Sequence, residues 1–183
     1  MQQKNLVRKK YYLLRKKKYY EINEFFFIPL VKLIKLKFKK KRIKLAFYYP
    51  SSFEINVLKL LEFKYISNQN VLLPIIEENN VMNFFSWKKN EVLQINKYGM
   101  LEPIESKLNI PNIILVPLLA FDKDKHRLGY GKGFYDRYLN KYLKKFKNIL
   151  TVGVAFSFQK YNKLPVNNND VKLDYILTEK GFY

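Results

Sequence analysis

The fold of this 183-residue chain is decided by the segment Val116-Pro-Leu-Leu-Ala-Phe-Asp-Lys-Asp-Lys-His-Arg-Leu-Gly-Tyr-Gly-Lys-Gly-Phe-Tyr-Asp-Arg137. The apolar run 113–116 leads into it and predicts a strand that is buried on both faces. At its far end, apolar side chains recur every three or four residues over 134–146, which predicts an amphipathic helix. The segment therefore predicts a strand and a helix joined by a glycine-containing loop.

On both sides of this unit, strand-like and helix-like segments alternate. No internal repeat, low-complexity linker or hinge rich in Pro, Gly or Ser divides the chain, so we expect a single domain over residues 1–183. The alternation predicts an α/β fold with a mostly parallel open sheet and helices on both faces. Ligands of such sheets bind beyond the carboxyl ends of the strands. The other expected strands are 43–49, 71–76, 82–87, 150–156 and about 175–178, and the expected helical segments are 4–20, 21–40 with Pro29 at a break or start, and 55–61.

The composition excludes several classes of protein. With 48% hydrophobic and 17% aromatic residues, the chain is not a disordered tail. The absence of cysteine excludes disulfides, thiolate nucleophiles and cysteine-ligated zinc. A single histidine, His126, excludes a histidine-rich metal site and argues against a Ser-His-Asp relay. No partner for it is evident nearby in the sequence, so we expect a loop residue.

The net charge of +20 is concentrated near the start of the chain. Residues 1–44 hold 16 Lys or Arg residues against Glu21 and Glu24. Such a surface could bind nucleic acid through counterion release. The alternative is a general bias toward Lys, Asn, Ile, Phe and Tyr, with the lysine runs on solvated helix faces. No nucleic-acid-binding motif accompanies the charge, so we expect no specific nucleic-acid partner.

No membrane or secretory segment is expected. The N-terminus is cationic but lacks the short uncharged apolar run of a signal peptide. The most apolar stretch, 25–36, contains Lys32 and Lys35 and is shorter than the roughly 20 apolar residues that a span requires. We therefore expect a cytoplasmic protein without a membrane partner, and we take it to be a monomer.

Three of the six glycines, Gly129, Gly131 and Gly133, alternate just before the expected helix. Glycine allows positive φ and lets backbone N–H groups approach a ligand without a Cβ atom in the way. A helix N-terminus adds unpaired N–H donors and about half a positive charge. Arg127 and Lys132 add mobile positive charge around the same loop. The segment therefore predicts a cradle for a nucleotide phosphate.

Asp136, in the first turn of the expected helix, has two possible uses. It could stabilise the helix start, or it could ligate a magnesium ion that arrives with a nucleotide. Alternating glycines taken alone also fit an ordinary turn with a capping aspartate. Their spacing matches neither the Rossmann G-x-G-x-x-G pattern nor the Walker P-loop.

The full wording of the central motif is more specific than its glycines. It reads Asp-x-x-x-x-Arg-Leu-Gly-x-Gly-x-Gly-Phe-Tyr-Asp from Asp122 to Asp136, after an apolar strand and before a helix. This pattern closely resembles the signature of the 5-formyltetrahydrofolate cyclo-ligase family, also called methenyltetrahydrofolate synthetases. Further stretches that resemble the family occur in the family's order. They are Lys4-Asn-Leu-Val-Arg8 with Arg15 as a further basic position, Tyr48-Tyr-Pro-Ser-Ser-Phe-Glu-Ile-Asn56, Lys97-Tyr-Gly-Met-Leu-Glu-Pro103, Val152-Gly-Val-Ala155, Leu164-Pro-Val166 and Asn169-Asp-Val-Lys-Leu-Asp174.

The resemblance implies a ligase that depends on ATP and Mg²⁺. Its substrate would be 5-formyltetrahydrofolate, whose formyl oxygen is phosphorylated before N10 closes the ring to give 5,10-methenyltetrahydrofolate, ADP and phosphate. The resemblance also implies roles for individual residues. The catalytic residues would be Arg127, Lys132 and Tyr135, the folate contacts Tyr49 and Glu54, and the magnesium ligands Asp136 and Asp170. The ATP-binding residues would be Lys4, Arg8, Arg127, Leu128, Gly129, Tyr130, Gly131, Lys132, Gly133, Phe134 and Tyr135.

Each implied role has a structural alternative. Lys4 and Arg8 could be solvated cations, Glu54 a charge at a helix start, and Asp170 a turn residue. Trp87 could line a pterin pocket or pack in the core. Two other functions also stay open on the sequence. One is a nucleic-acid-binding module that uses the basic N-terminal surface, and the other is an ATP-dependent enzyme of the same scaffold that acts on another N-formyl or pterin compound.

Overall fold

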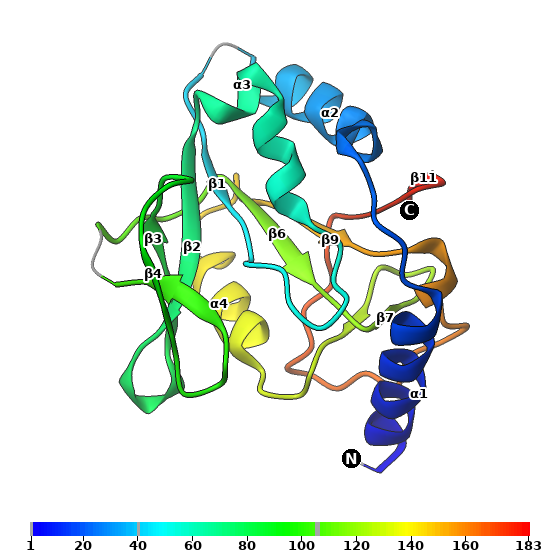
Figure 1. Ribbon diagram of the computed structural model, residues 1–183. Coiled ribbons are helices and arrows are strands. Elements are labelled where there is room, and N and C mark those ends of the chain that lie inside the picture. The colour runs from blue at the N-terminus through cyan, green and yellow to red at the C-terminus, as the bar shows by residue number, and fades with distance from the viewer. Residues whose placement is uncertain (1, 40, 105–106) are drawn as a thin grey trace.

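The computed structural model describes residues 2–39, 41–104 and 107–183, and it places strands at the centre with helices around them (Figure 1). The α-helices are α1 (Gln2–Lys18), α2 (Ile28–Phe38), α3 (Lys64–Ser67) and α4 (Phe134–Tyr142), and the 3₁₀ helices are η1 (Glu24–Phe27), η2 (Val57–Glu62), η3 (Glu78–Asn80) and η4 (Ser157–Gln159). The strands are β1 (Lys44–Ala46), β2 (Asn70–Ile76), β3 (Met82–Ser86), β4 (Leu93–Ile95), β5 (Leu101–Pro103), β6 (Ile113–Pro117), β7 (Ala120–Phe121), β8 (Arg127–Leu128), β9 (Leu150–Val154), β10 (Tyr175–Thr178) and β11 (Gly181–Phe182).

Seven of these strands form one mixed sheet. Their order is β11-β10-β9-β6-β1-β2-β3. The five inner strands run parallel, with Leu45 of β1 opposite Ile113 of β6 and Ile113 in turn opposite Leu150 of β9. The edge strands β3 and β11 are antiparallel to their neighbours. The predicted α/β fold with a mostly parallel sheet is therefore confirmed.

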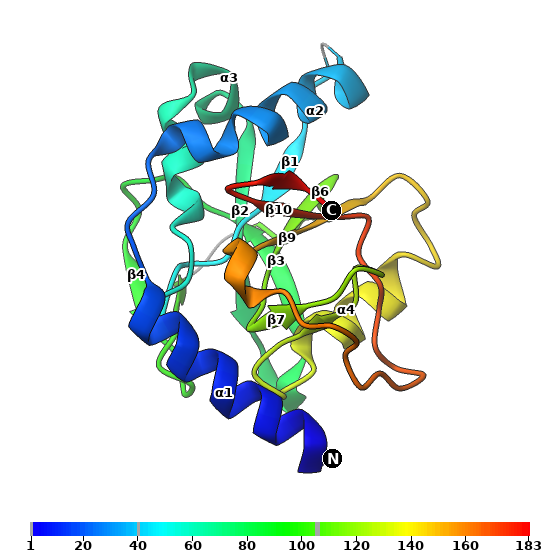
Figure 2. The ribbon, with the colours of Figure 1, turned by 90° about the vertical axis from the view of Figure 1, so that its right-hand side faces the viewer.

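Helices cover both faces of the sheet because the central strand is apolar on both (Figure 2). The first four side chains of β6 are fully buried, and they alternate between two cores. Ile113 and Leu115 pack in the core that contains residues of α2, η2 and α3. Ile114 and Val116 pack in the core that contains Tyr138 and Leu139 of α4. The predicted cover on both faces is confirmed.

The order in which the chain adds strands to the sheet reverses at β1. From β1 it goes to β2 on one side, and it later returns to β6 on the other side of β1. The first connection contains η2 and α3, whereas the connection from β6 to β9 contains α4 on the opposite face. A reversal of this kind leaves a crevice beyond the carboxyl ends of the two strands. The segments that enter this crevice are 47–56 after β1 and 118–133 after β6.

Some predicted elements differ in detail from the observed ones. Most of the segment 55–61 lies in the 3₁₀ helix η2 (Val57–Glu62), and its fully buried side chains Val57 and Leu60 are three residues apart, which fits the 3₁₀ period. Helix α2 has Pro29 in its first turn, where a missing N–H costs no hydrogen bond. The hairpins β4–β5 and β7–β8 and the strand β11 have only two or three residues per strand, too few for a periodic signal. Within the described part of the chain, no helix is long and apolar enough to cross a membrane.

Candidate functional site

A short hairpin holds the glycine-rich loop against the rest of the protein. In this hairpin, β7–β8, the Leu119 N–H donates to the Leu128 carbonyl at 2.7 Å. The Leu128 side chain is buried in a small core with Val7 and Tyr11 of α1. Leu128 therefore anchors the loop through its side chain, and only its backbone is left for a ligand.

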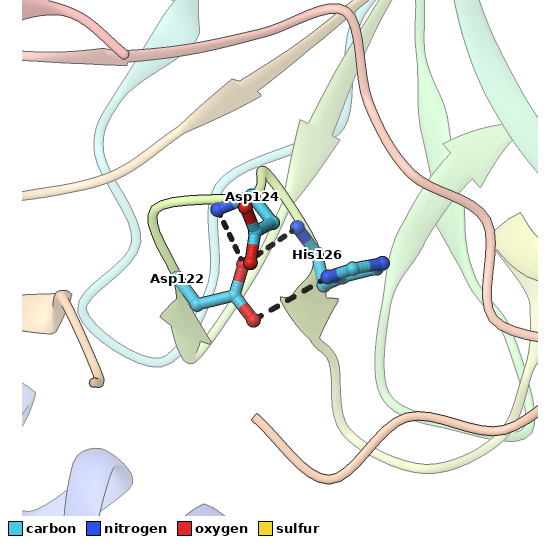
Figure 3. A group of neighbouring side chains, drawn as sticks. All are labelled: Asp122, Asp124 and His126. Atoms are coloured by element: carbon cyan, nitrogen blue, oxygen red, sulfur yellow. Dashed lines mark hydrogen bonds and ion pairs between the residues drawn. The ribbon is translucent and has the colours of Figure 1, made fainter. Parts of the chain in front are cut away.

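Asp122 organises the turn of this hairpin (Figure 3). Its Oδ1 accepts hydrogen bonds from the backbone N–H groups of Asp124 and His126, both at 3.0 Å. Its Oδ2 accepts the Leu164 N–H at 3.2 Å and lies 3.4 Å from His126 Nδ1. The partner of His126 that the sequence did not reveal is thus a buried carboxylate four residues away. Ligand atoms of the three side chains lie within 4.8 Å of one another, but backbone donors already occupy both Asp122 oxygens, so we interpret the cluster as a support of the loop.

The glycines after this hairpin have different reasons to be glycine. Gly131 and Gly133 adopt φ of +97° and +69°, a region that other residues rarely occupy. Gly133 also precedes the first residue of α4 and lacks a side chain that could cap it. The N-terminal N–H groups of α4 are therefore open to a ligand. Gly129 does not adopt positive φ, so the alternation of three glycines reflects two conformational requirements rather than three.

Two cations of helix α1 have partners in other segments of the chain. The Arg8 Nε donates to the Gly129 carbonyl at 2.9 Å. A Cβ atom on Gly131 would lie 3.1 Å from the Arg8 guanidinium carbon, so the loop and this side chain are in direct contact. The Lys4 Nζ lies 2.5 Å from Asp170 Oδ2. The structure thus places Arg8 against the glycine loop and pairs Lys4 with Asp170, so neither cation simply faces solvent.

Arg127 lies beneath the loop as a buried cation. Its side chain is only 4% exposed. One end of its guanidinium donates to the Val171 carbonyl at 2.7 Å, and the other donates to Asp136 Oδ1 at 2.8 Å. Burial lowers the pKa of Arg127, and the neighbouring Asp136 opposes this shift. In this arrangement Arg127 ties the start of α4 to the segment around Val171.

The two predicted metal ligands lie beside each other at this place. The Val171 N–H donates to Asp136 Oδ1 at 3.1 Å, which brings the residue that follows Asp170 against Asp136. Among the described residues, hydrogen bonds reach only Oδ1 of Asp136 and only Oδ2 of Asp170. One oxygen of each carboxylate is left over, and carboxylate oxygens with additional water are what Mg²⁺ prefers. The residues therefore fit a magnesium ion that arrives with a nucleotide.

Glu54 occupies the opposite side of the crevice in a strained turn. The Glu54 N–H donates to the Ser51 carbonyl at 2.9 Å, and the two residues between them, Ser52 and Phe53, have φ of +49° and +66°. Such a turn normally contains Gly or Asn, and each bulkier residue in this region costs about 1–3 kcal/mol. The Ser51 N–H closes the turn from the other side by donating to Glu54 Oε2 at 3.0 Å. The turn therefore directs a carboxylate that is only 7% exposed.

Burial shapes the protonation of this side of the crevice. It raises the pKa of Glu54, and the Arg15 charge together with hydrogen bonds from Ser51 and Tyr130 opposes that rise. Burial and the nearby Glu54 raise the pKa of Tyr135 and keep it a phenol. The Tyr135 hydroxyl and the Trp87 indole N–H are buried, and neither has a hydrogen-bond partner within the described residues. A buried unpaired donor costs about 1–3 kcal/mol, so both groups are suited to be satisfied by a ligand.

The remaining predicted positions lie around these two sides. The Tyr49 ring lies 6.5 Å from that of Trp87, which packs in the core and also has the unpaired N–H. Lys132 is exposed, and its ammonium lies 5.5 Å from the centre of the Tyr98 ring. The same ring lies 5.3 Å from that of Phe134. These side chains border the glycine loop on its outer side.

The sequence offered Arg15 only as a further basic position and did not indicate that its side chain is buried. Arg15 is 2% exposed, although it lies among exposed cations in the last turn of α1. The signal that could have found it is its spacing, because Val7, Tyr11 and Arg15 are four residues apart and share the buried face of the helix. A cation at a core-facing position requires partners, and those of Arg15 lie in the crevice.

A glycine-rich helix start and a buried acid thus face one crevice at the reversal point of a parallel sheet. This combination is typical of an α/β protein that binds its ligand beyond the carboxyl ends of the parallel strands, here β1 and β6. The parts of the site come from α1, from the loops after β1 and β6, and from the segment around Asp170.

Comparison with known proteins identifies the family. The model of the 5-formyltetrahydrofolate cyclo-ligase family matches residues 26–179. The 5-formyltetrahydrofolate cyclo-ligase of Haemophilus influenzae is 34% identical over 143 residues, which cover 73% of this chain and 74% of that protein. The structure of Aquifex aeolicus 5,10-methenyltetrahydrofolate synthetase matches with a TM-score of 0.74 at 30% identity, over 98% of this chain and 91% of that one. A Mycoplasma pneumoniae synthetase matches with a TM-score of 0.69 at 28% identity, over 95% and 97%. The chain belongs to the 5-formyltetrahydrofolate cyclo-ligase family and is an enzyme of that family.

Proposed function

We propose that this enzyme converts 5-formyltetrahydrofolate and ATP into 5,10-methenyltetrahydrofolate, ADP and phosphate, with Mg²⁺ as the metal. The observation that carries the proposal is the meeting of two different half-sites in one crevice. One half is the glycine loop with Arg8 beside Gly129, and the other is the buried Glu54 with the unpaired Tyr135 hydroxyl. Family membership and the names of the relatives support the assignment of the substrate.

The glycine loop and the α1 cations would hold the ATP phosphates. Phosphoryl transfer requires mainly positioning and neutralisation of charge. The open N–H groups at the start of α4 supply donors, and Lys4, Arg8 and the exposed Lys132 supply charge. Phosphate binding would compete with Asp170 for the Lys4 ammonium, which frees that carboxylate.

Asp136 and Asp170 would hold the magnesium ion through their unengaged oxygens. Bound there with ATP, the metal would neutralise charge on the phosphates. Arg127 would hold the Asp136 carboxylate in a fixed direction, since its guanidinium donates to the other oxygen of that carboxylate.

The folate half-site would orient the formyl group toward the phosphates. The Glu54 carboxylate is suited to accept hydrogen bonds from the N–H groups of the pterin. Tyr49 and Trp87 would border the ring, and the Tyr135 hydroxyl would donate a hydrogen bond to the substrate. The formyl oxygen attacks the γ-phosphorus and ADP leaves. N10 then forms a bond to the formyl carbon and loses its proton, and the carbon–oxygen bond breaks as phosphate leaves.

The test is the appearance of the methenyl chromophore in the near ultraviolet. Purified protein is mixed with Mg²⁺, ATP and 5-formyltetrahydrofolate, with omission of ATP as the control, and ADP is measured in parallel. We expect an ATP-dependent increase in absorbance with one ADP per product. If ADP is released from ATP in the presence of another N-formyl or pterin compound, but not in the presence of 5-formyltetrahydrofolate, that compound would become the proposed substrate. No turnover and no ATP binding by the folded protein would reject the proposal.

A further inference from the structure

We propose that Arg15 is a positioning residue that couples the folate half-site to the nucleotide half-site. The inference rests on the proposed function and assigns Arg15 a role through the residues to which it donates. Its basis is a set of three hydrogen bonds from one buried guanidinium, which reach the residue after β6, the turn after β1 and the glycine loop.

The Arg15 guanidinium joins the loop after β6 to the turn after β1. Its Nη1 donates to the Leu118 carbonyl at 3.0 Å, directly behind β6. Its Nη2 donates to the Ser52 carbonyl at 2.8 Å. These two acceptors lie at the carboxyl ends of the two strands between which the ligand crevice opens. The guanidinium therefore fixes how the two walls of the crevice stand relative to each other.

The third bond of Arg15 reaches the glycine loop. Its Nη2 also donates to the Tyr130 hydroxyl, and the guanidinium carbon lies 5.6 Å from the centre of that ring. The Tyr130 hydroxyl interacts in addition with the Glu54 carboxylate, whose pKa this hydrogen bond lowers. A tyrosine of the nucleotide loop thus lies between the buried cation and the folate carboxylate.

The turn that Arg15 holds is one that its sequence does not favour. Ser52 and Phe53 both occupy the left-handed region without glycine, and Ser52 is the residue whose carbonyl Arg15 binds. Strain of this kind persists only where surrounding contacts hold it. Without Arg15, the turn can relax, and Glu54 then loses its fixed direction.

The charge of Arg15 acts on Glu54 as well. Among the described residues no carboxylate lies within ion-pair distance of Arg15. Its charge nevertheless opposes the rise that burial causes in the pKa of Glu54. The charged and titratable groups that face Glu54 are Arg15 from α1, Tyr130 from the glycine loop, Tyr135 from α4 and Tyr48 after β1.

The test compares Arg15→Met and Tyr130→Phe with the matched control Lys16→Met. Lys16 is exposed in the same turn of α1, so its variant loses the same charge without the contacts. For Arg15→Met we expect the KM for 5-formyltetrahydrofolate to rise about tenfold and kcat to fall, while the affinity for Mg-ATP alone changes less than about twofold. The acid limb of kcat/KM for the folate should move to higher pH. Lys16→Met should leave all of these unchanged.

Tyr130→Phe keeps the ring and removes only the hydroxyl that accepts from Arg15. We expect the same direction of change in the KM for the folate, and no further loss when it is combined with Arg15→Met. This variant decides the question if Arg15→Met does not fold. An unchanged acid limb and unchanged folate KM in both variants, with only a lower melting temperature in Arg15→Met, would overturn the proposal.

A second readout does not depend on turnover. The free energy of unfolding is measured against pH for the wild type, Arg15→Met, Glu54→Gln and the double variant. If Arg15 acts on Glu54, its removal shifts the pH-dependent loss of stability upward in the presence of Glu54 and not in its absence. Equal shifts with and without Glu54 would refute the coupling. The same coupling in a protein without cyclo-ligase turnover would instead refute the proposed function alone.

Discussion

Substitution of Gly131 by alanine tests the nucleotide half-site most directly. Gly131 has a φ of +97°, and a Cβ atom there would meet three atoms of the Arg8 guanidinium at 3.1–3.3 Å. The backbone conformation alone costs an alanine about 1–2 kcal/mol. In addition, Arg8 must move by a few tenths of an ångström, which weakens its bond to the Gly129 carbonyl.

The matched control for this substitution is Gly181→Ala. Gly181 has a similar φ of +101°, no atom lies within 4 Å of a Cβ atom placed there, and it lies at the start of β11. Both variants should therefore lose about 1–2 kcal/mol of stability. This corresponds to a decrease in Tm of roughly 2–8 °C for a protein of this size.

The two variants should differ in nucleotide affinity. A charged hydrogen bond contributes about 1.5–3 kcal/mol, and partial loss of the Arg8 bond should weaken Mg-ATP binding by roughly tenfold in Gly131→Ala. Gly181→Ala should bind Mg-ATP as the wild type does. Isothermal titration of each folded protein with Mg-ATP gives the two dissociation constants. Equal affinities in both variants would refute the role of the loop and of Arg8 in phosphate binding.

Three further predictions concern charge and packing. Asp136→Asn leaves the buried Arg127 without its counter-charge, so the free energy of unfolding measured in urea should decrease by about 2–4 kcal/mol. We also expect turnover of this variant to require a higher Mg²⁺ concentration. An unchanged Mg²⁺ requirement would contradict the metal assignment. Because burial raises the pKa of Glu54 in the folded state, the wild type should lose stability as pH rises from the ordinary value of 4.5 through the raised value. The Glu54→Gln variant should not show this loss of stability. Stability profiles that run parallel against pH for the wild type and the variant would contradict this prediction. Gly153→Ala would place a Cβ atom 2.6 Å from Ile176 Cδ1, so overpacking should cost about 1–3 kcal/mol, and an unchanged Tm would argue against this packing.

The parts of the fold that could be predicted are those with a long periodic signal. The uninterrupted apolar run of β6 and the three-to-four spacing of α4 each identify their element and the faces it buries. The two hairpins and β11 could not be predicted, because strands of two or three residues are defined by their partners. For η2, the sequence predicted a helical segment at 55–61, but its 3₁₀ geometry and its bounds at Val57–Glu62 come from the structure.

The candidate site also has parts that could be predicted from the sequence and parts that could not. The glycine loop could be predicted because its chemistry lies in one continuous stretch of sequence. The turn at Ser52 and Phe53 could not, since neither residue is typical of positive φ and the Ser52 carbonyl is bound by Arg15 from another element. Arg15 itself is one cation among many in α1, and its burial is a property of the tertiary structure. The assignments of ATP, Mg²⁺ and the individual residues remain predictions.

The contact between Lys4 and Asp170 has a consequence for how the protein is made. These residues are 166 positions apart, so a growing chain displays the cations of α1 long before their acidic partner has been synthesised. The glycine loop also precedes the segment around Val171 that anchors Arg127. A chain that ends before Asp170 therefore carries the cations of α1 without the carboxylate that pairs with Lys4. The late segment that supplies Asp170 and Val171 therefore completes the contacts of Lys4 and Arg127 only near the end of synthesis.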